Sequence, residues 1–374
     1  MSNVEAEPVI NPQAGNAATS PQLPEPLWIT IIKENKYLHD DSSYENTIAP
    51  HIAQLFQEYL LSDDESSTAA TALKFDSMYE DLYLPNYNGR GNGRKKGWTG
   101  YLSYFYETVF VIAKHIPYND PLQDKVIQLL LELKKLPSRA TKIGSYEGWE
   151  WIDSTVWQCD PQFIGQLGNA HDSAPPSWTS EGYLSSGSSY EPEEYEEAAR
   201  ECEIDPLRWV NYHALRARCI LAGLYEGYEG YLDGPSATIS YVLGPEEERY
   251  PGDILDVTVM AACNYILMIG DIIDSECVQK QQPPYRYQWK CWEDGNGPAV
   301  WKQWARRLSE IIEDLEKGND SGLHIREKNR DALQELVTKA RARMAELEPA
   351  LVIDMEAERV REAKKRLDKK RRKE

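Results

Sequence analysis

The chain has 374 residues and a formal net charge of −20, and 41% of its residues are hydrophobic. Such a length and apolar content suffice to bury a large core, which excludes a chain that is disordered throughout. The acidic balance disfavours nucleic-acid binding over most of the surface, because phosphates would be repelled. Tyr and Trp (23 and 11) outnumber Phe (5), which suits half-buried positions with a polar tip.

The ends and the most apolar run indicate neither secretion nor a membrane span. Residues 1–26 have no basic start and no apolar block, so we expect a disordered leader rather than a signal peptide. The apolar run 254–273 is interrupted by Asp256, Asn264 and Asp271, which favours a buried helix. We therefore expect a cytoplasmic or nuclear protein with no membrane partner.

Apolar residues recur at helical spacing in the first segments, "PLWITIIKENKYL", "IAPHIAQLFQEYLL" and "STAATALKFDSMYEDLYLP", the last of which should end at Pro85. Residues 86–100 then form a loop rich in Gly, Asn and Arg. Its glycine spacing matches neither GxxxxGK[ST] nor GxGxxG, and it follows a helix rather than a strand. We interpret it as a flexible basic loop without a phosphate-binding role.

The next two helices are separated by the turn "IPYNDPLQ". Pro117 should stop the first helix, and Asp120, Pro121 and Gln123 have the spacing of an N-cap, an N1 proline and a capping-box partner. The stripe of Val126, Leu129, Leu130 and Leu133 predicts the buried face of the second helix. In this interpretation Gln123 serves only to start a helix.

The middle of the chain repeats this pattern. The segment 148–167, "GWEWIDSTVWQCDPQFIGQL", is predicted to be mostly helical, and residues 169–203 to be an acidic surface insertion. Asp205 and Pro206 should begin another helix, whose buried face includes Trp209 and His213.

Three further helices complete the prediction. The segment 251–279 is hydrophobic on nearly all sides and should be central, and Pro298–Lys317 keeps helical phase up to Gly318. From 319 to 374 we expect a charged helical extension whose narrow apolar seam is typical of a docking or coiled-coil helix. The only candidate strand is "TISYVL", residues 238–243. The fold class predicted is all-α, a multi-helical bundle or irregular helical array with one domain over 27–318.

No pattern calls for a metal or a cofactor. The six cysteines are scattered without a CxxC pair, as expected for small core residues in a reducing compartment. Asp271, Asp274 and Glu276 resemble the metal-binding carboxylates of class I terpene cyclases, but the second motif of those enzymes is not matched. We expect these acids to be solvated at a helix end, and we predict no catalytic, metal or cofactor residue.

A few residues remain candidates for an interaction site or pocket. Arginines inside an apolar helix can pair with acids of a neighbouring helix or clamp an anion, a histidine there is more often a hydrogen-bonded core residue, and Trp-rich sets favour interfaces or fill gaps between helices. The candidates are Trp209, His213, Arg216, Arg218, Trp289, Trp292, Trp301 and Trp304.

The last sixteen residues carry a charge of +7, so the rest of the chain carries −27, the difference between −20 and +7. Such a basic tail suits either a nuclear import signal or a solvated helix end, and it is the one segment that could contact a polyanion. The cluster consists of Lys364, Lys365, Arg366, Lys369, Lys370, Arg371, Arg372 and Lys373.

Several of these motifs resemble a fungal family of unknown function, the 3632 group. The matching elements are Tyr106-Glu107, Ile116-Pro117-Tyr118, Asp120-Pro121-Leu122-Gln123, Leu136-Pro137, and the set Trp209, Asn211, Ala217 and Arg218. The resemblance covers about residues 100–310, and the Asp-Pro-x-Gln element is its most specific part. It implies an all-helical intracellular protein and supplies no catalytic residues.

Three functions stay open at this point. The first is a non-enzymatic protein-binding or scaffold protein, with a partner on an aromatic face or on the C-terminal helix. The second is a helical enzyme or small-molecule binder with a Trp/Tyr-lined pocket. The third is a nuclear factor that depends on the basic tail. The oligomeric state is not predicted.

Overall fold

The computed structural model describes residues 25–34, 48–64, 67–86, 97–144, 151–158, 161–172, 207–226, 231–244, 256–279, 297–318 and 325–350, with 357, 360–361 and 364–365. These residues form an all-α fold with one small hairpin, which confirms the predicted class. The α-helices are α1 (Leu27–Glu34), α3 (Ala49–Leu61), α4 (Ser67–Met78), α5 (Leu84–Asn86), α6 (Gly97–Ala113), α7 (Leu122–Lys134), α8 (Pro161–Asp172), α11 (Arg208–Leu221), α12 (Asp233–Leu243), α13 (Asp256–Ile273), α15 (Gly297–Glu316) and α16 (Arg330–Leu347). The other elements are strands β1 (Ala140–Gly144) and β2 (Trp151–Thr155), π-helical segments η1 (Tyr79–Tyr83) and η4 (Asp274–Gln279), and the 3-10 turn η5 (Glu327–Asn329).

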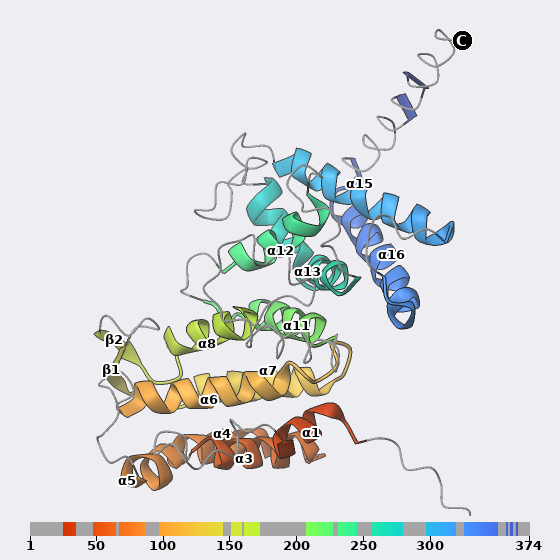
Figure 1. Cartoon of the computed structure of the whole chain (residues 1–374). Helices are drawn as coiled ribbons and strands as arrows, with labels where there is room; N and C mark the ends of the chain where they lie inside the picture. The colour runs from red at the N-terminus through yellow and green to blue at the C-terminus, as the bar shows by residue number, and fades with distance from the viewer. Residues whose placement is uncertain are drawn as a thin grey trace, which may run out of the picture.

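The helices are stacked in layers that follow the chain order (Figure 1). Helices α1, α3, α4 and α5 form the first layer, α6 and α7 the second, and α8 and α11 the third. Helices α12 and α13 come next, and α15 and α16 lie at the other end. The main contacts join neighbouring layers: α3 with α6, α4 with α7, α6 with α8, α11 with α13, and α13 with α16. This arrangement fits the irregular helical array that the sequence predicts.

Helix α13 is the most deeply buried element, as its uniformly apolar sequence predicts. Every residue from Asp256 to Ile266 is buried, and the helix packs against α11, α12 and α16. In the described part of the chain, one helix, Asp256–Glu276, is long and apolar enough to cross a membrane, but 78% of that window is buried inside the protein. This burial is that of a core helix.

A buried carboxylate joins the start of α13 to the start of α16. Asp256 is fully buried, and its Oδ1 accepts a hydrogen bond from the backbone N–H of Val257 at 2.8 Å. Its Oδ2 accepts from the backbone N–H of Arg326 at 3.0 Å and from the Asn329 side-chain amide at 2.9 Å. The carboxylate therefore satisfies donors from two segments that are about 70 positions apart in the sequence.

The predicted seam of the C-terminal helix is used inside the chain. Leu333, Val337, Ala340 and Met344 are each 0% exposed, and α16 packs on α13 and α15. The predicted helix 298–317 is also confirmed within one residue at each end, and Gly318 follows it with a φ of 74°. The apolar seam is thus part of the core of this array.

Two secondary-structure expectations were wrong. Residues 151–155 form strand β2, which pairs antiparallel with β1 so that Ala140 lies opposite Thr155; among the described residues of segment 148–167, the helix begins at Pro161. The segment 238–243, which was the one candidate strand, belongs to helix α12. Its β-branched residues lie in a helix because α12 packs against α13 and α15, and tertiary packing outweighs local propensity.

Three boundaries also needed correction. Pro85 does not end its helix, because α4 continues through the π-helical η1 into α5, which ends at Asn86. The predicted loop 86–100 overlaps helix α6, which begins at Gly97. Helix α8 reaches Asp172, inside the predicted insertion 169–203.

Several expectations concern residues outside those the structure describes. These are most of the leader (1–24), loop residues 87–96, insertion residues 173–203, the predicted cap Asp205-Pro206, and most of the basic tail.

Candidate functional site

The family-like motifs meet in one polar connection between α7 and α11. Gln123, at the start of α7, is 0% exposed. Its amide Nε2 donates to the backbone carbonyl of Ile116 at 2.9 Å and to that of Asn211 at 3.0 Å. Its Oε1 accepts from Arg218 Nη1 at 3.0 Å, while Arg218 Nε donates to Asp124 Oδ1 at 2.8 Å. Two layers of the array are therefore joined by a satisfied buried amide.

Asn211 extends this connection to the turn before α7. Its Oδ1 accepts from the backbone N–H of Tyr118 at 2.9 Å, and the residue is buried. The turn residues, the Asp-Pro-x-Gln element and the later Asn and Arg of α11 thus contact one another. The residues that carry the family resemblance therefore form a packing contact between α7 and α11.

The capping box predicted for the start of α7 does not form. Asp120 does act locally, because its Oδ1 accepts from the backbone N–H of Leu122 at 2.9 Å. Gln123, however, donates to Ile116 and Asn211 instead of returning to the backbone N–H of Asp120. The helix also begins one residue later than predicted, with Pro121 rather than Asp120 at the N-cap, and Gln123 links α7 to the preceding turn and to α11.

Ring side chains and one arginine gather along one side of α11. We call this group the α11 cluster, and it consists of Trp209, Tyr212, His213, Arg216 and Tyr265. His213 is fully buried, and its Nδ1 lies 2.7 Å from the Tyr265 hydroxyl on α13. The rings of Trp209 and His213 meet edge to face with centroids 4.4 Å apart. The predicted candidates Trp209, His213 and Arg216 therefore share one face of α11, whereas Arg218 points to α7.

Arg216 is the charged member of the α11 cluster. It hydrogen-bonds the Tyr225 hydroxyl, and its Nε is buried without a hydrogen-bond partner. Among the residues that the structure describes, no carboxylate forms an ion pair with Arg216. Burial alone would lower the pKa of Arg216, but the neighbouring Tyr225, Tyr212 and Tyr265 hydroxyls raise it, so the guanidinium stays charged.

The other groups of the α11 cluster and its surroundings are poorly suited to nucleophilic or base chemistry. Burial raises the pKa of the Cys219 thiol to about 12, so the thiol is protonated at neutral pH. Burial likewise raises the pKa of Tyr265 well above its usual value. The Tyr212 hydroxyl donates to the Leu167 carbonyl at 2.6 Å. These contacts hold α8, α11 and α13 together.

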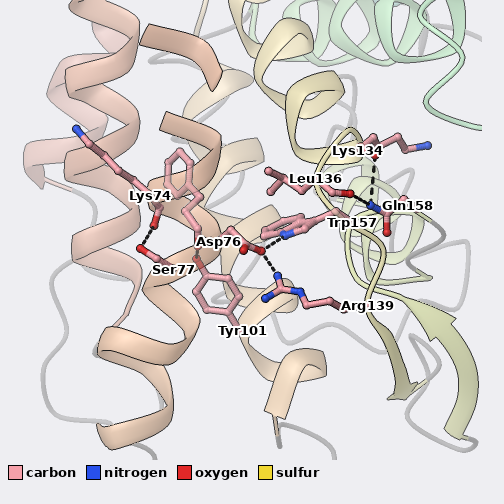
Figure 2. A network of polar contacts seen from close by, with 10 residues as sticks. Lys74, Asp76, Ser77, Tyr101, Lys134, Leu136, Arg139, Trp157 and Gln158 are labelled. Atoms are coloured by element: carbon pink, nitrogen blue, oxygen red, sulfur yellow. Dashed lines mark hydrogen bonds and ion pairs between the residues drawn. The ribbon is translucent and has the colours of Figure 1, made fainter. Parts of the chain in front are cut away.

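A second polar network, which the sequence analysis missed, anchors the hairpin (Figure 2). The Asp76 carboxylate of α4 accepts from the Trp157 indole Nε1 at 2.7 Å and forms an ion pair with Arg139. Arg139 also lies over the Trp98 ring, with its guanidinium carbon 4.6 Å from the ring centroid. Trp157 has a φ of 70°, which no sequence signal indicated. Because Asp76 is far from both Arg139 and Trp157 in the sequence, local spacing could not reveal the network.

The remaining candidates do not join either group. Trp301 and Trp304 are each 1% exposed, with ring centroids 6.3 Å apart, and lie on the buried face of α15. Trp289 and Trp292 lie outside the described residues. Of the basic cluster, only Lys364 and Lys365 are described, and both are exposed.

The acids at the end of α13 are separated by their partners and positions. Asp271 is an exposed carboxylate that lies 3.3 Å from Arg343 of α16, whereas Asp274 is buried. Within the described ranges, no group of three or more His, Cys, Asp or Glu side chains is placed to hold a metal ion.

Comparison with known protein families identifies a match over the middle of the chain. The family described as "Protein of unknown function (DUF3632)" matches residues 106–308, more than half of the chain. The matched range begins in α6 and ends in α15, so it contains the α7–α11 connection and the α11 cluster. No curated protein and no solved structure matches the chain.

Proposed function

The chain belongs to the DUF3632 family of proteins of unknown function, and we propose that it is a non-enzymatic, protein-binding scaffold of stacked helix pairs. The observation that carries this proposal is the serial stacking of its layers, in which the main contacts join each layer to the next. Stacked helical arrays present extended surfaces, and they commonly use them to bind other proteins.

The use of the polar side chains also supports a scaffold. Gln123, Asn211 and Arg218 join α7 to α11, and Asp256 joins α13 to α16. Their hydrogen-bonding atoms are directed to backbone groups and to one another, which makes them connectors between layers. A catalytic residue would instead need atoms directed toward a substrate.

The first layer offers the best docking surface for a partner. Five large apolar side chains are strongly exposed in the described part of the chain, and three of them, Leu61, Leu73 and Leu84, lie on α3, α4 and α5. Leu73 on α4 is 57% exposed. A contiguous patch of exposed apolar side chains favours contact with another protein, and we infer that these three leucines contribute to one.

The charge of the chain indicates the partner's chemistry. The exposed acids Glu80 and Asp81 lie between Leu73 and Leu84 in the sequence, and the whole chain carries −20. Complementary charge steers association and fixes orientation. We therefore infer a protein partner that presents an apolar contact surrounded by Lys and Arg.

The test compares two matched substitutions in the full-length chain. Leu73→Glu places a charge on α4, and Leu221→Glu places the same charge on α11 at a nearly equal exposure, 59%. Affinity purification from the native cell, with quantitative mass spectrometry and cross-linking, should find a basic protein that wild type and Leu221→Glu enrich and Leu73→Glu loses. Identical enrichment by all three, or cross-links that avoid α3–α5, would contradict the proposal.

Truncation at Gly318 would be a poor substitute for these variants. It would remove α16, whose Leu333, Val337 and Met344 are fully buried. The apolar surface of α13 would then become exposed and could bind proteins non-specifically. Point variants on the surface keep the core intact.

A further inference from the structure

Arg216 presents an energetic problem that its packing does not solve. A buried charge is unfavourable unless an opposite charge or several hydrogen bonds accompany it. In the part of the chain that is described, Arg216 has a hydrogen bond to Tyr225 but no ion pair, and its Nε is buried and unpartnered. Arg218, two residues along the same helix, contacts both Asp124 and Gln123.

The guanidinium also lies against the first turn of α12. A Cβ added to Gly234 would be 2.3 Å from Nη1 of Arg216 and 2.5 Å from its Cζ, so the two groups are in close contact. Helix α12 has eleven residues, and its N-cap residue Leu232 provides no side-chain cap. The first backbone N–H groups of a helix carry partial positive charge and favour anions. A cation and a positive helix end therefore converge at one place.

We propose that Arg216 and the first turn of α12 together bind the carboxylate or phosphate group of a small anionic ligand. An oxyanion would accept hydrogen bonds from the planar guanidinium and would neutralise both positive features. Arg216 is partly exposed as a whole residue although its Nε is buried, and we infer that a ligand reaches the guanidinium through the exposed part.

The rings beside Arg216 indicate the rest of the ligand. Tyr225, which hydrogen-bonds Arg216, has its ring centroid 6.4 Å from that of Tyr231, and Tyr231 is partly exposed just before α12. Aromatic side chains favour flat apolar groups. The site is therefore suited to an oxyanion attached to an aromatic or apolar body, and it goes beyond the scaffold function, on which it does not depend.

The direct test measures anion binding to the full-length chain by calorimetry and thermal unfolding. The probes are inorganic phosphate and benzoate, with chloride at equal ionic strength as the control. Wild type and the matched variant Arg218→Gln should each bind one or both probes saturably with a rise in Tm. Arg216→Gln should bind at least tenfold more weakly. Binding within twofold of wild type by Arg216→Gln, or no saturable binding of either probe to wild type, would overturn the proposal.

A second measurement needs no variant and covers the case in which Arg216→Gln does not fold. Phenylglyoxal labels accessible arginines, and peptide mapping reports each site. Phosphate or benzoate should slow labelling of Arg216 several-fold and leave Arg218 unchanged. Equal labelling of Arg216 with and without the probes would overturn the proposal.

A carboxylate from the chain itself is the competing explanation, and Asp233 adjoins Gly234 in the sequence. If Asp233 neutralised Arg216, anions would bind only to the Asp233→Asn variant. That result would overturn the proposal, whereas saturable binding to wild type supports it.

Discussion

The polar connection at Gln123 makes a quantitative prediction for the variant Gln123→Leu. The replacement has a similar volume, so it tests hydrogen bonding more than packing. It removes two neutral hydrogen bonds, to the carbonyls of Ile116 and Asn211, and one bond from the charged Arg218. At about 1 kcal/mol for each neutral bond and about 2 kcal/mol for the charged one, the loss is about 4 kcal/mol.

The added apolar surface of leucine offsets part of this loss, roughly 1 kcal/mol. We therefore expect Gln123→Leu to lower the free energy of unfolding by about 3 kcal/mol. Urea unfolding followed by circular dichroism measures this change, provided that the slope of the transition is unchanged. The matched control is Gln128→Leu, the same substitution at an exposed position of the same helix, which should stay within about 0.5 kcal/mol of wild type.

A small effect would refute the reasoning. If Gln123 served only to cap α7, Gln123→Leu would cost about 1 kcal/mol, as capping substitutions do. A double-mutant cycle with Arg218→Leu adds a separate check, because contacting residues show coupling of about 0.5–3 kcal/mol. Additive effects of Gln123→Leu and Arg218→Leu would mean that their contact contributes nothing.

Four further expectations concern stability. Asp256→Ala should cost about 3 kcal/mol in chemical unfolding, because it leaves buried donors from two segments unsatisfied; a loss below 1 kcal/mol would contradict this role. Gly318→Ala should cost about 1 kcal/mol, since φ is 74° there and an added Cβ meets no atom within 4 Å, so only backbone strain acts; no loss would contradict this account. Burial raises the pKa of Cys219 and Tyr265, so the contribution of these two groups to stability is complete below their pKa values in the unfolded chain, about 9 and 10. The free energy of unfolding should fall as the pH rises above these values, and the urea midpoint measured as a function of pH tests the direction of this change. Arg216→Met should leave the ligand-free protein equally or more stable, because it removes a buried charge without an ion pair; a loss above 2 kcal/mol would show that packing requires the guanidinium.

Much of the helical architecture could be predicted because it depends on local periodicity. The segment that became α15 has a regular apolar stripe and a glycine after its last turn, and its predicted ends were correct within one residue. Helix α13 was recognised as central from its nearly uniform apolar character, which the burial of Asp256 to Ile266 confirms. Both signals lie within about 20 consecutive residues and need no knowledge of distant partners.

Features that depend on distant contacts could not be predicted in the same way. The spacing of Asp120 and Gln123 fits a capping box, but the partner that decides the role of Gln123, Asn211, lies 88 positions further along the chain. The strands of the hairpin are five residues long and have no strong alternation. The left-handed backbone of Trp157 is fixed by its burial and by its bond to Asp76, which is 81 positions away.

The two arginines of α11 show how far packing explains the candidate site. Arg218 and Arg216 are the same residue type on the same helix, and no local pattern distinguishes their roles. Arg218 faces α7, where Asp124 neutralises it and Gln123 accepts from it, so its role in joining layers is complete. Arg216 faces α12 and α13, contacts the positive end of a helix at Gly234, and forms no ion pair among the described residues. A scaffold needs connectors such as Arg218, whereas a cation held against a helix N-terminus is favourable only when an anion joins it. The difference between these two environments is therefore the strongest reason to look for a ligand in this array.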